Sequence, residues 1–187
     1  MSAILEIPEV RQRVSPLSVE EYHRLDEFNE NSRRTELIRG IVLEKIKKSP
    51  LHCAIAGRLY DRIAPILPQD YLVLRDDPLT LRDSEPEPDI AVVRGSEADF
   101  FTAHPTTAEL VIEVAVSSPA LDRESAFLYA EANVKEYWIV LGRERLVEVY
   151  RRPENGRYQE TMLFGAGDTL ECLSVPTVRI RVAELFQ

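Results

Sequence analysis

The sequence has little cysteine and no apolar segment as long as a bilayer span. Its two cysteines, Cys53 and Cys172, lie in unrelated contexts without metal-type spacing. Isolated thiols favour two reduced cytoplasmic side chains over a disulfide framework or a thiolate metal centre. The N-terminus also lacks the basic-then-apolar layout of a signal peptide. These absences predict a cytoplasmic protein that has no membrane partner.

Acidic side chains outnumber basic ones, with 32 Asp and Glu against 23 Lys and Arg. The formal net charge is −9 at pH 7 and the isoelectric point is about 5.0. A protein that holds nucleic acid by charge alone is basic, because its affinity comes from neutralising phosphates. One cluster of basic residues could form either a local basic surface or an ordinary solvated hairpin. It comprises Arg33, Arg34, Arg39, Lys45, Lys47 and Lys48.

What the sequence does contain is typical of an ordinary soluble globular protein. Its 187 residues are 44% hydrophobic and 29% charged. We predict a single domain over residues 1–187, in which residues 1–15 form an N-terminal arm. The order of apolar patterns predicts an α/β fold, with a central mixed β-sheet flanked by helices and with antiparallel hairpins at the C-terminal end.

Three segments have helical periodicity and end signals. In the second, Ser49 is a candidate N-cap, Pro50 suits the first helical position, and Pro65 should end or kink the helix. In the third, Asp122 is the candidate N-cap and Asn133 the candidate left-handed stop. The predicted helices begin near residues 18, 49 and 122.

Strand patterns fill most of the remaining sequence. A hairpin is expected around Gly40, and the Asn155-Gly156 dipeptide predicts a second tight turn. The aromatic pair Tyr137 and Trp138 is either core or part of a homodimer interface, and we also expect a homodimer or higher homo-oligomer. The expected strands are 35–46 (as a hairpin), a strand, turn and short strand between 71 and 83, then 89–93, 108–118, 134–141, 145–152 and the segments around the second turn.

Two carboxylates interrupt apolar strands. Asp89 precedes "IAVV" and Glu113 lies inside "LVIEVAV". A carboxylate in a buried strand is costly unless it is paired or binds a metal. On neighbouring strands, about 5 Å apart, both could face one hard cation such as Mg²⁺. Glu36 is a third candidate, whereas Glu85 and Glu87 are interpreted as acids of an approach loop.

Each carboxylate also has a purely structural explanation. Asp89 could cap a turn, Glu113 could pair with Arg123 or Arg58, and Glu36 could be an exposed residue. Taken singly, these explanations are at least as good as the functional one. Two acids at matching positions of successive apolar strands nevertheless make an unusual coincidence, which favours a shared site.

The ordered segments resemble a known family. They are "RRTELIRGIVLEKI", "SPLH", "SEPEPDIAVV", "LVIEVAVSS" and "LYAEANVKEYWIV". Together they are similar to the Uma-type endonuclease family, abundant in cyanobacteria, within the PD-(D/E)XK nuclease superfamily and its restriction-endonuclease-like fold. The resemblance implies a metal-dependent nuclease that hydrolyses DNA phosphodiester bonds with Mg²⁺ or Mn²⁺.

The resemblance also assigns roles to individual residues. Asp89 and Glu113 would be the metal ligands, and Glu36 would touch the metal or its water. His52 would contact phosphate or order water, although a capping or packing histidine is the more ordinary reading.

The lysine of the motif is where this sequence departs from the family. In the simplest form of the motif the lysine stands two residues after Glu113, but here that position is Ala115. In this family the lysine usually lies on the following helix, where this sequence has Ser125. The lysine normally positions water or stabilises developing negative charge, and serine cannot supply that charge. Arg123 and Lys45 are the candidate replacements.

Two other functions remain possible. A catalytically silent nuclease-fold protein, acting as a binding or regulatory module, would also lose the lysine. A metal-dependent hydrolase of another substrate class is the second, but the sequence has no glycine-rich phosphate loop and no serine–histidine elbow to indicate a particular small molecule.

Overall fold

The computed structural model describes residues 8–11, 13–26, 34–117 and 119–187. Their contacts divide them into two compact units. The smaller lies within residues 1–45 and 82–86, and the larger comprises residues 46–81 and 87–187. The single domain over residues 1–187 stays a prediction.

The smaller unit is built on a two-stranded antiparallel hairpin. Its elements are α1 (Pro8–Arg11), α2 (Val19–Asp26), β1 (Thr35–Ile38) and β2 (Ile41–Glu44). The hairpin turns at Gly40, whose φ of +73° suits glycine, and a Cβ there would lie 2.4 Å from Pro16 Cβ. The expected hairpin is confirmed, and a short helix lies within the expected N-terminal arm.

Glu85 has a structural role in this unit. Its backbone N–H donates to Leu37 O at 2.7 Å, which adds a bridge to β1. Its carboxylate Oε1 lies 2.7 Å from His23 Nε2, and the residue is only 6% exposed. Glu85 does lie in the loop that approaches β4, as expected, but it is buried there and its backbone and side chain are both engaged.

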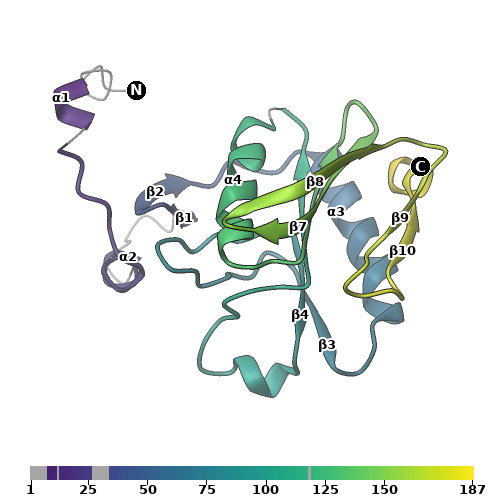
Figure 1. Cartoon of the computed structure of the whole chain (residues 1–187), viewed down its shortest axis with the longest axis horizontal. Helices are drawn as coiled ribbons and strands as arrows, with labels where there is room; N and C mark the ends of the chain where they lie inside the picture. The colour runs from purple at the N-terminus through teal and green to yellow at the C-terminus, as the bar shows by residue number, and fades with distance from the viewer. Residues whose placement is uncertain (1–7, 12, 27–33, 118) are drawn as a thin grey trace. The chain divides into compact units, whose positions relative to one another are not determined.

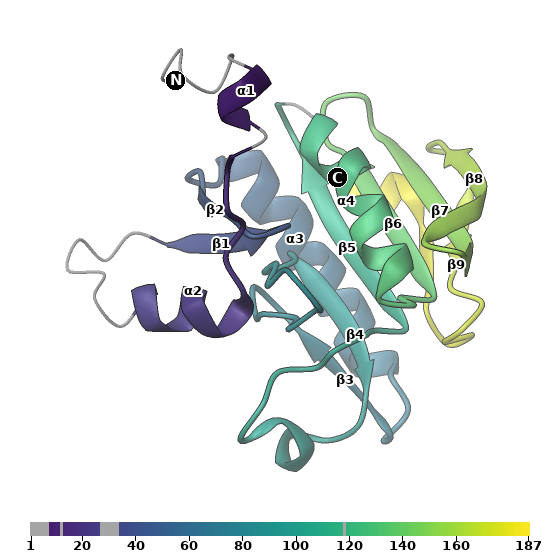
Figure 2. The ribbon, with the colours of Figure 1, turned by 60° about the vertical axis from the view of Figure 1, so that its left-hand side comes forward.

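The larger unit contains a six-stranded mixed sheet in the order β3-β4-β5-β6-β7-β8, whose strands are all labelled in the second view (Figures 1 and 2). Only the central pair, β5 and β6, is parallel, and every other neighbouring pair is antiparallel. The strands are β3 (Tyr71–Leu74), β4 (Ile90–Arg94), β5 (Leu110–Ala115), β6 (Glu136–Leu141), β7 (Leu146–Glu154) and β8 (Arg157–Phe164). The expected α/β fold with a central mixed sheet is confirmed.

One face of this sheet packs on α3 (Pro50–Ile63) and on the C-terminal segment. Alternate strand residues such as Ile90, Ile112 and Trp138 join Leu59 of α3 in one buried cluster. A short 3-10 helix, Ala64–Ile66, follows α3 and contains Pro65, as expected. The C-terminal segment comprises β9 (Thr169–Glu171), β10 (Arg179–Arg181) and the 3-10 helix Val182–Phe186.

The helix α4 (Ala120–Glu131) covers the opposite face, as the two views show (Figures 1 and 2). It begins two residues before Asp122, with Pro119 at the cap position, so the prediction of Asp122 as N-cap was wrong. Asn133 has a φ of +58°, which confirms the predicted left-handed stop.

Three further details test the sequence expectations. Asn155 and Gly156 both have positive φ, as the tight turn between β7 and β8 requires. The prediction of a short strand after β3 was wrong, because residues 75–84 form a loop that contains no strand. Tyr137 and Trp138 are fully buried in the chain, which confirms the core alternative for this pair and removes its support for a dimer.

Candidate functional site

The two predicted carboxylates lie side by side at the junction of β4 and β5. Because Ile90 pairs with Ile112 in antiparallel register, Asp89 falls opposite Glu113. The Asp89 backbone N–H donates to Glu113 Oε2 at 3.2 Å, and Val114 N–H donates to Asp89 Oδ2 at 2.8 Å. Each acid thus accepts a hydrogen bond from the other acid's strand, and both carboxylates belong to one small region.

Asp89 is 3% exposed and faces two basic side chains. Lys48 Nζ lies 2.5 Å from Asp89 Oδ1, and His52 Nε2 lies 2.7 Å from the same oxygen. A buried carboxylate would be costly without partners, and these two contacts together with Val114 N–H supply them. The predicted site residue His52 is therefore held at Asp89.

The start of α3 explains how both basic residues reach Asp89. Ser49 is the N-cap, and its side chain accepts from His52 N–H at 3.3 Å. Pro50 occupies the first helical position, as the sequence predicted. The cap fixes the first turn, so that His52 projects from it while Lys48 immediately precedes it.

Lys48 is shared between two acids. Its ammonium also hydrogen-bonds to Asp76, in the connection between β3 and β4. Asp76 has a φ of +58°, and its backbone N–H donates to Pro88 O at 3.1 Å. This bond ties the residue that holds Lys48 to the segment that carries Asp89.

The electrostatics of the cluster favour charged forms. Burial acts to raise the pKa of Asp89, but the hydrogen bond and charge of His52, followed by those of Lys48, outweigh it and leave that pKa below its usual value. For Lys48, burial acts to lower the pKa, and the carboxylates of Asp89 and Asp76 more than compensate. The result is an ammonium beside an ionised carboxylate.

The Glu113 carboxylate is also held by a tyrosine. Tyr129 of α4 donates its hydroxyl hydrogen to Glu113 Oε1 at 3.1 Å, and its ring lies 4.8 Å from that of Tyr137. Burial and then the negative charge of Glu113 raise the pKa of Tyr137 well above its ordinary value. Tyr129 therefore orients the second carboxylate from the helix side.

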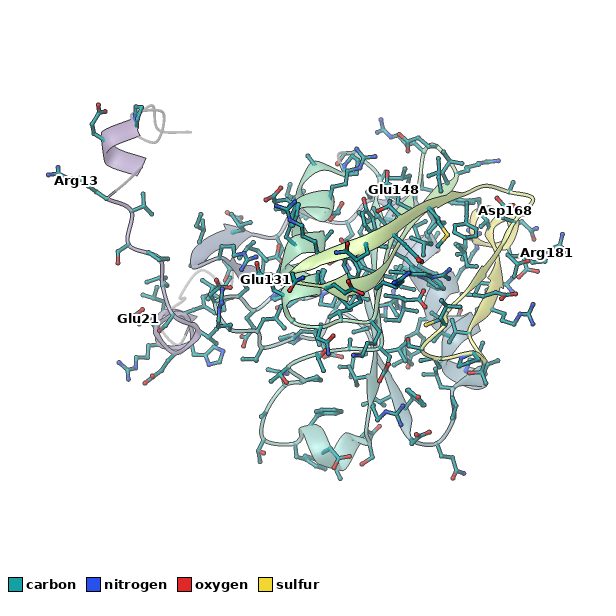
Figure 3. The ribbon with its side chains drawn as sticks, viewed as in Figure 1. Arg13, Glu21, Glu131, Glu148, Asp168 and Arg181 are labelled. Atoms are coloured by element: carbon teal, nitrogen blue, oxygen red, sulfur yellow. The ribbon has the colours of Figure 1, made fainter. Side chains whose placement is uncertain are left out.

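Arg123 and Ser125, both on α4, occupy different environments. Arg123 donates to both carboxylate oxygens of Glu148, which is labelled on β7 in Figure 3. Arg58 donates to Leu185 O at 3.1 Å. Both arginines suggested as partners of Glu113 are thus engaged elsewhere. Ser125 is buried one helical turn before Tyr129, on the same side of α4.

The other predicted site residues, Glu36 and Lys45, lie in the smaller unit. There Lys45 Nζ is 3.8 Å from Glu36 Oε2. Their roles in the site stay predictions. Of the basic cluster, Arg39 also faces an acid, Asp83, whereas Arg33 lies outside the described residues.

The donor chemistry at Asp89 and Glu113 fits a hard divalent cation. Both side chains offer carboxylate oxygens, which suit Mg²⁺ together with water and phosphate oxygens. Across the described ranges, no three His, Cys, Asp or Glu side chains form a group that could hold a metal by themselves. A two-carboxylate site completed by water and substrate is compatible with both observations.

Comparisons with known proteins identify the family and the fold. Residues 19–183 match the family model described as "Uma2: Putative restriction endonuclease". The chain belongs to the Uma2 family. One solved structure, described as a "putative nuclease belonging to DUF820" from Anabaena variabilis, has a TM-score of 0.74 and 19% identity, over 91% of this chain and 98% of that one. No curated protein matches.

For this Uma2 chain, sequence reasoning missed three residues of the site. Lys48 was noticed only as part of a basic cluster, while Asp76 and Tyr129 were not singled out. A lysine just before a helix N-terminus opposes the helix dipole, and that mismatch could have indicated a nearby acid. Asp76 and Tyr129 carry no comparable local signal.

Within the described residues, no helix has the length and apolar character to cross a membrane.

Proposed function

We propose that this protein is a divalent-metal-dependent nuclease that hydrolyses phosphodiester bonds of DNA. The observation that carries the proposal is the pairing of Asp89 and Glu113 across β4 and β5, with Asp89 buried among hydrogen-bond donors. The Uma2 family and the nuclease fold support the same class of chemistry.

In this proposal Asp89 and Glu113 hold Mg²⁺ or Mn²⁺. When bound, the cation would supply positive charge to the scissile phosphate and lower the pKa of a water. His52 keeps Asp89 oriented through its 2.7 Å contact, and Tyr129 does the same for Glu113 at 3.1 Å. These fixed partners position both carboxylates before substrate arrives.

The reaction is the addition of water across one phosphodiester bond. The water oxygen forms a new bond to phosphorus, and one ester P–O bond breaks on the opposite side. The leaving oxygen takes up a proton, the attacking water loses one to solvent, and the products are a phosphate monoester and a hydroxyl. A cation at the site also explains how a chain of net charge −9 could approach DNA.

The test is cleavage of supercoiled plasmid and of single-stranded DNA by purified protein, with Mg²⁺ or Mn²⁺. We expect nicked or linear products from the wild type and none from Asp89→Ala or Glu113→Gln. Equal cleavage by all three proteins would indicate a contaminating nuclease. If none of the proteins cleaves, the silent binding module becomes the better account.

A further inference from the structure

The site lacks a lysine on β5 or α4, yet it does not lack an ammonium group. Lys48, which precedes α3, places Nζ 2.5 Å from Asp89 Oδ1. In the sequence Lys48 is 41 residues from Asp89, so neither motif spacing nor strand register indicates the contact. Its side chain is 25% exposed, whereas that of Asp89 is 4% exposed.

We infer that Lys48 is a catalytic residue that contacts the scissile phosphate or its attacking water, and that Asp76 is its positioning residue. This inference rests on the proposed nuclease function. Hydrolysis of a phosphodiester develops negative charge on the phosphate oxygens, and an ammonium held beside them stabilises that charge.

The geometry allows Lys48 to change partners. Its ammonium has three donors and contacts two carboxylates, Asp89 and Asp76. A cation on Asp89 would compete with Lys48 for Oδ1, while Asp76 would continue to hold the lysine beside the site. Asp76 is suited to this because its own backbone is tied to Pro88 O at 3.1 Å.

His52 does not replace Lys48 in this role. It also contacts Asp89 Oδ1, but its ring is attached to the capped first turn of α3. Its exposed fraction is 16%, against 25% for Lys48. The flexible stem of lysine can follow a phosphate oxygen, whereas the shorter histidine stays with the carboxylate that it orients.

The opposite side of the site offers a rescue position. Ser125 lies one turn before Tyr129 on α4, and the Tyr129 hydroxyl bonds to Glu113 Oε1 at 3.1 Å. A lysine at position 125 would therefore start from the face of α4 that meets the site. The positive charge can therefore be removed at Lys48 and restored at position 125.

The experiment measures single-turnover cleavage by wild type, Lys48→Met, Lys47→Met, Ser125→Lys and the double variant Lys48→Met/Ser125→Lys. Lys47 is an exposed neighbour and controls for general loss of DNA attraction. We expect Lys48→Met to lose about 100-fold in rate, while Lys47→Met stays within about threefold. The double variant should cleave about tenfold faster than Lys48→Met.

A second readout needs no DNA. Without the competing ammonium, Lys48→Met should bind Mn²⁺ about tenfold more tightly in calorimetry, because a nearby positive charge has been removed. Asp76→Asn should weaken Mn²⁺ binding and slow cleavage, because Lys48 is then held by Asp89 alone, and Asp76→Glu should restore most of both. Weaker Mn²⁺ binding in Lys48→Met would contradict the inference.

The outcomes separate this inference from the proposed function. If wild type and Lys48→Met cleave at equal rates, the nuclease function stands and the inference is wrong. If wild type is silent and Ser125→Lys alone gains cleavage, the site requires a lysine that Lys48 does not provide. If neither wild type nor Ser125→Lys cleaves DNA, the nuclease function is refuted and the inference with it. A less stable Lys48→Met that the second lysine does not rescue would reduce Lys48 to a structural partner of Asp89.

Discussion

The ammonium of Lys48 lies 2.5 Å from Oδ1 of Asp89, although the two residues come from different elements. Lys48 precedes α3, and Asp89 precedes β4. The contact gives a buried carboxylate its charge partner and gives the candidate site a cation. The family's lysine is replaced by Ser125 in this sequence. Lys48 is a side chain near the same carboxylates that could act in its place.

Metal removal is the first prediction. We expect EDTA to abolish DNA cleavage and added Mg²⁺ or Mn²⁺ to restore it, because Asp89 and Glu113 offer only oxygen ligands. Plasmid nicking measured before and after chelation, with dialysis between the steps, checks this. Cleavage that persists through chelation and dialysis would be incompatible with a metal-dependent reaction.

Tyr129→Phe should slow cleavage without unfolding the protein. The substitution removes the donor to Glu113 Oε1 and leaves the buried ring in place. We expect about a tenfold lower rate and a loss of about 1 kcal/mol in stability. Tyr158→Phe is the matched control, since its hydroxyl bonds to Val134 O at 2.9 Å instead. A similar rate loss in both variants would argue against a specific role for Tyr129.

The Arg123–Glu148 pair should affect stability and not cleavage. The hydrogen bond from Arg123 outweighs burial and holds the pKa of Glu148 below its usual value. The ionised carboxylate therefore stabilises the fold above about pH 4, and this contribution is lost as pH falls through the folded-state pKa.

The expected result for Glu148→Gln is a loss of up to about 1 kcal/mol at pH 7, because Arg123 is half exposed. The difference from wild type should shrink in urea melts near pH 3. Arg123→Met should cleave DNA within about threefold of the wild-type rate. A much larger drop would return Arg123 to the catalytic candidates.

Two glycine substitutions should have opposite signs. Gly57 lies inside α3, where an added Cβ meets nothing within 4 Å, so Gly57→Ala should stabilise by about 0.5–1 kcal/mol. Gly156 has a φ of +73°, and a Cβ there would lie 2.8 Å from Glu131 Cγ. Gly156→Ala should therefore destabilise by about 1 kcal/mol or more. Chemical denaturation of both variants measures the difference, and a shift of the same sign in both would contradict this account.

The sequence predicted the sheet and the carboxylate pair because those signals are local or periodic. Asp89 and Glu113 each interrupt an apolar strand, and the strand register then places one opposite the other. Ser49 and Asn133 were predicted correctly because capping residues act on their own backbone. Asp122 was not, since Pro119 starts the helix one turn earlier.

The basic partner of Asp89 could not be predicted in the same way. Arg123 and Lys45 were favoured because one lies near the expected lysine and the other on a strand. The structure instead bonds Arg123 to Glu148 and places Lys48 at Asp89. This choice depends on how α3 packs against the sheet, and a tertiary contact of that kind leaves no spacing in the sequence.

The most direct test of the nuclease account is single-turnover cleavage of end-labelled DNA with Mg²⁺ by three proteins purified in parallel. They are the wild type, Asp89→Asn and Asp168→Asn, the last being an exposed carboxylate that caps Gly165 N–H at 2.7 Å. The account predicts that wild type and Asp168→Asn cleave at the same rate and that Asp89→Asn loses about 100-fold or more. Equal rates for Asp89→Asn and the wild type would contradict it.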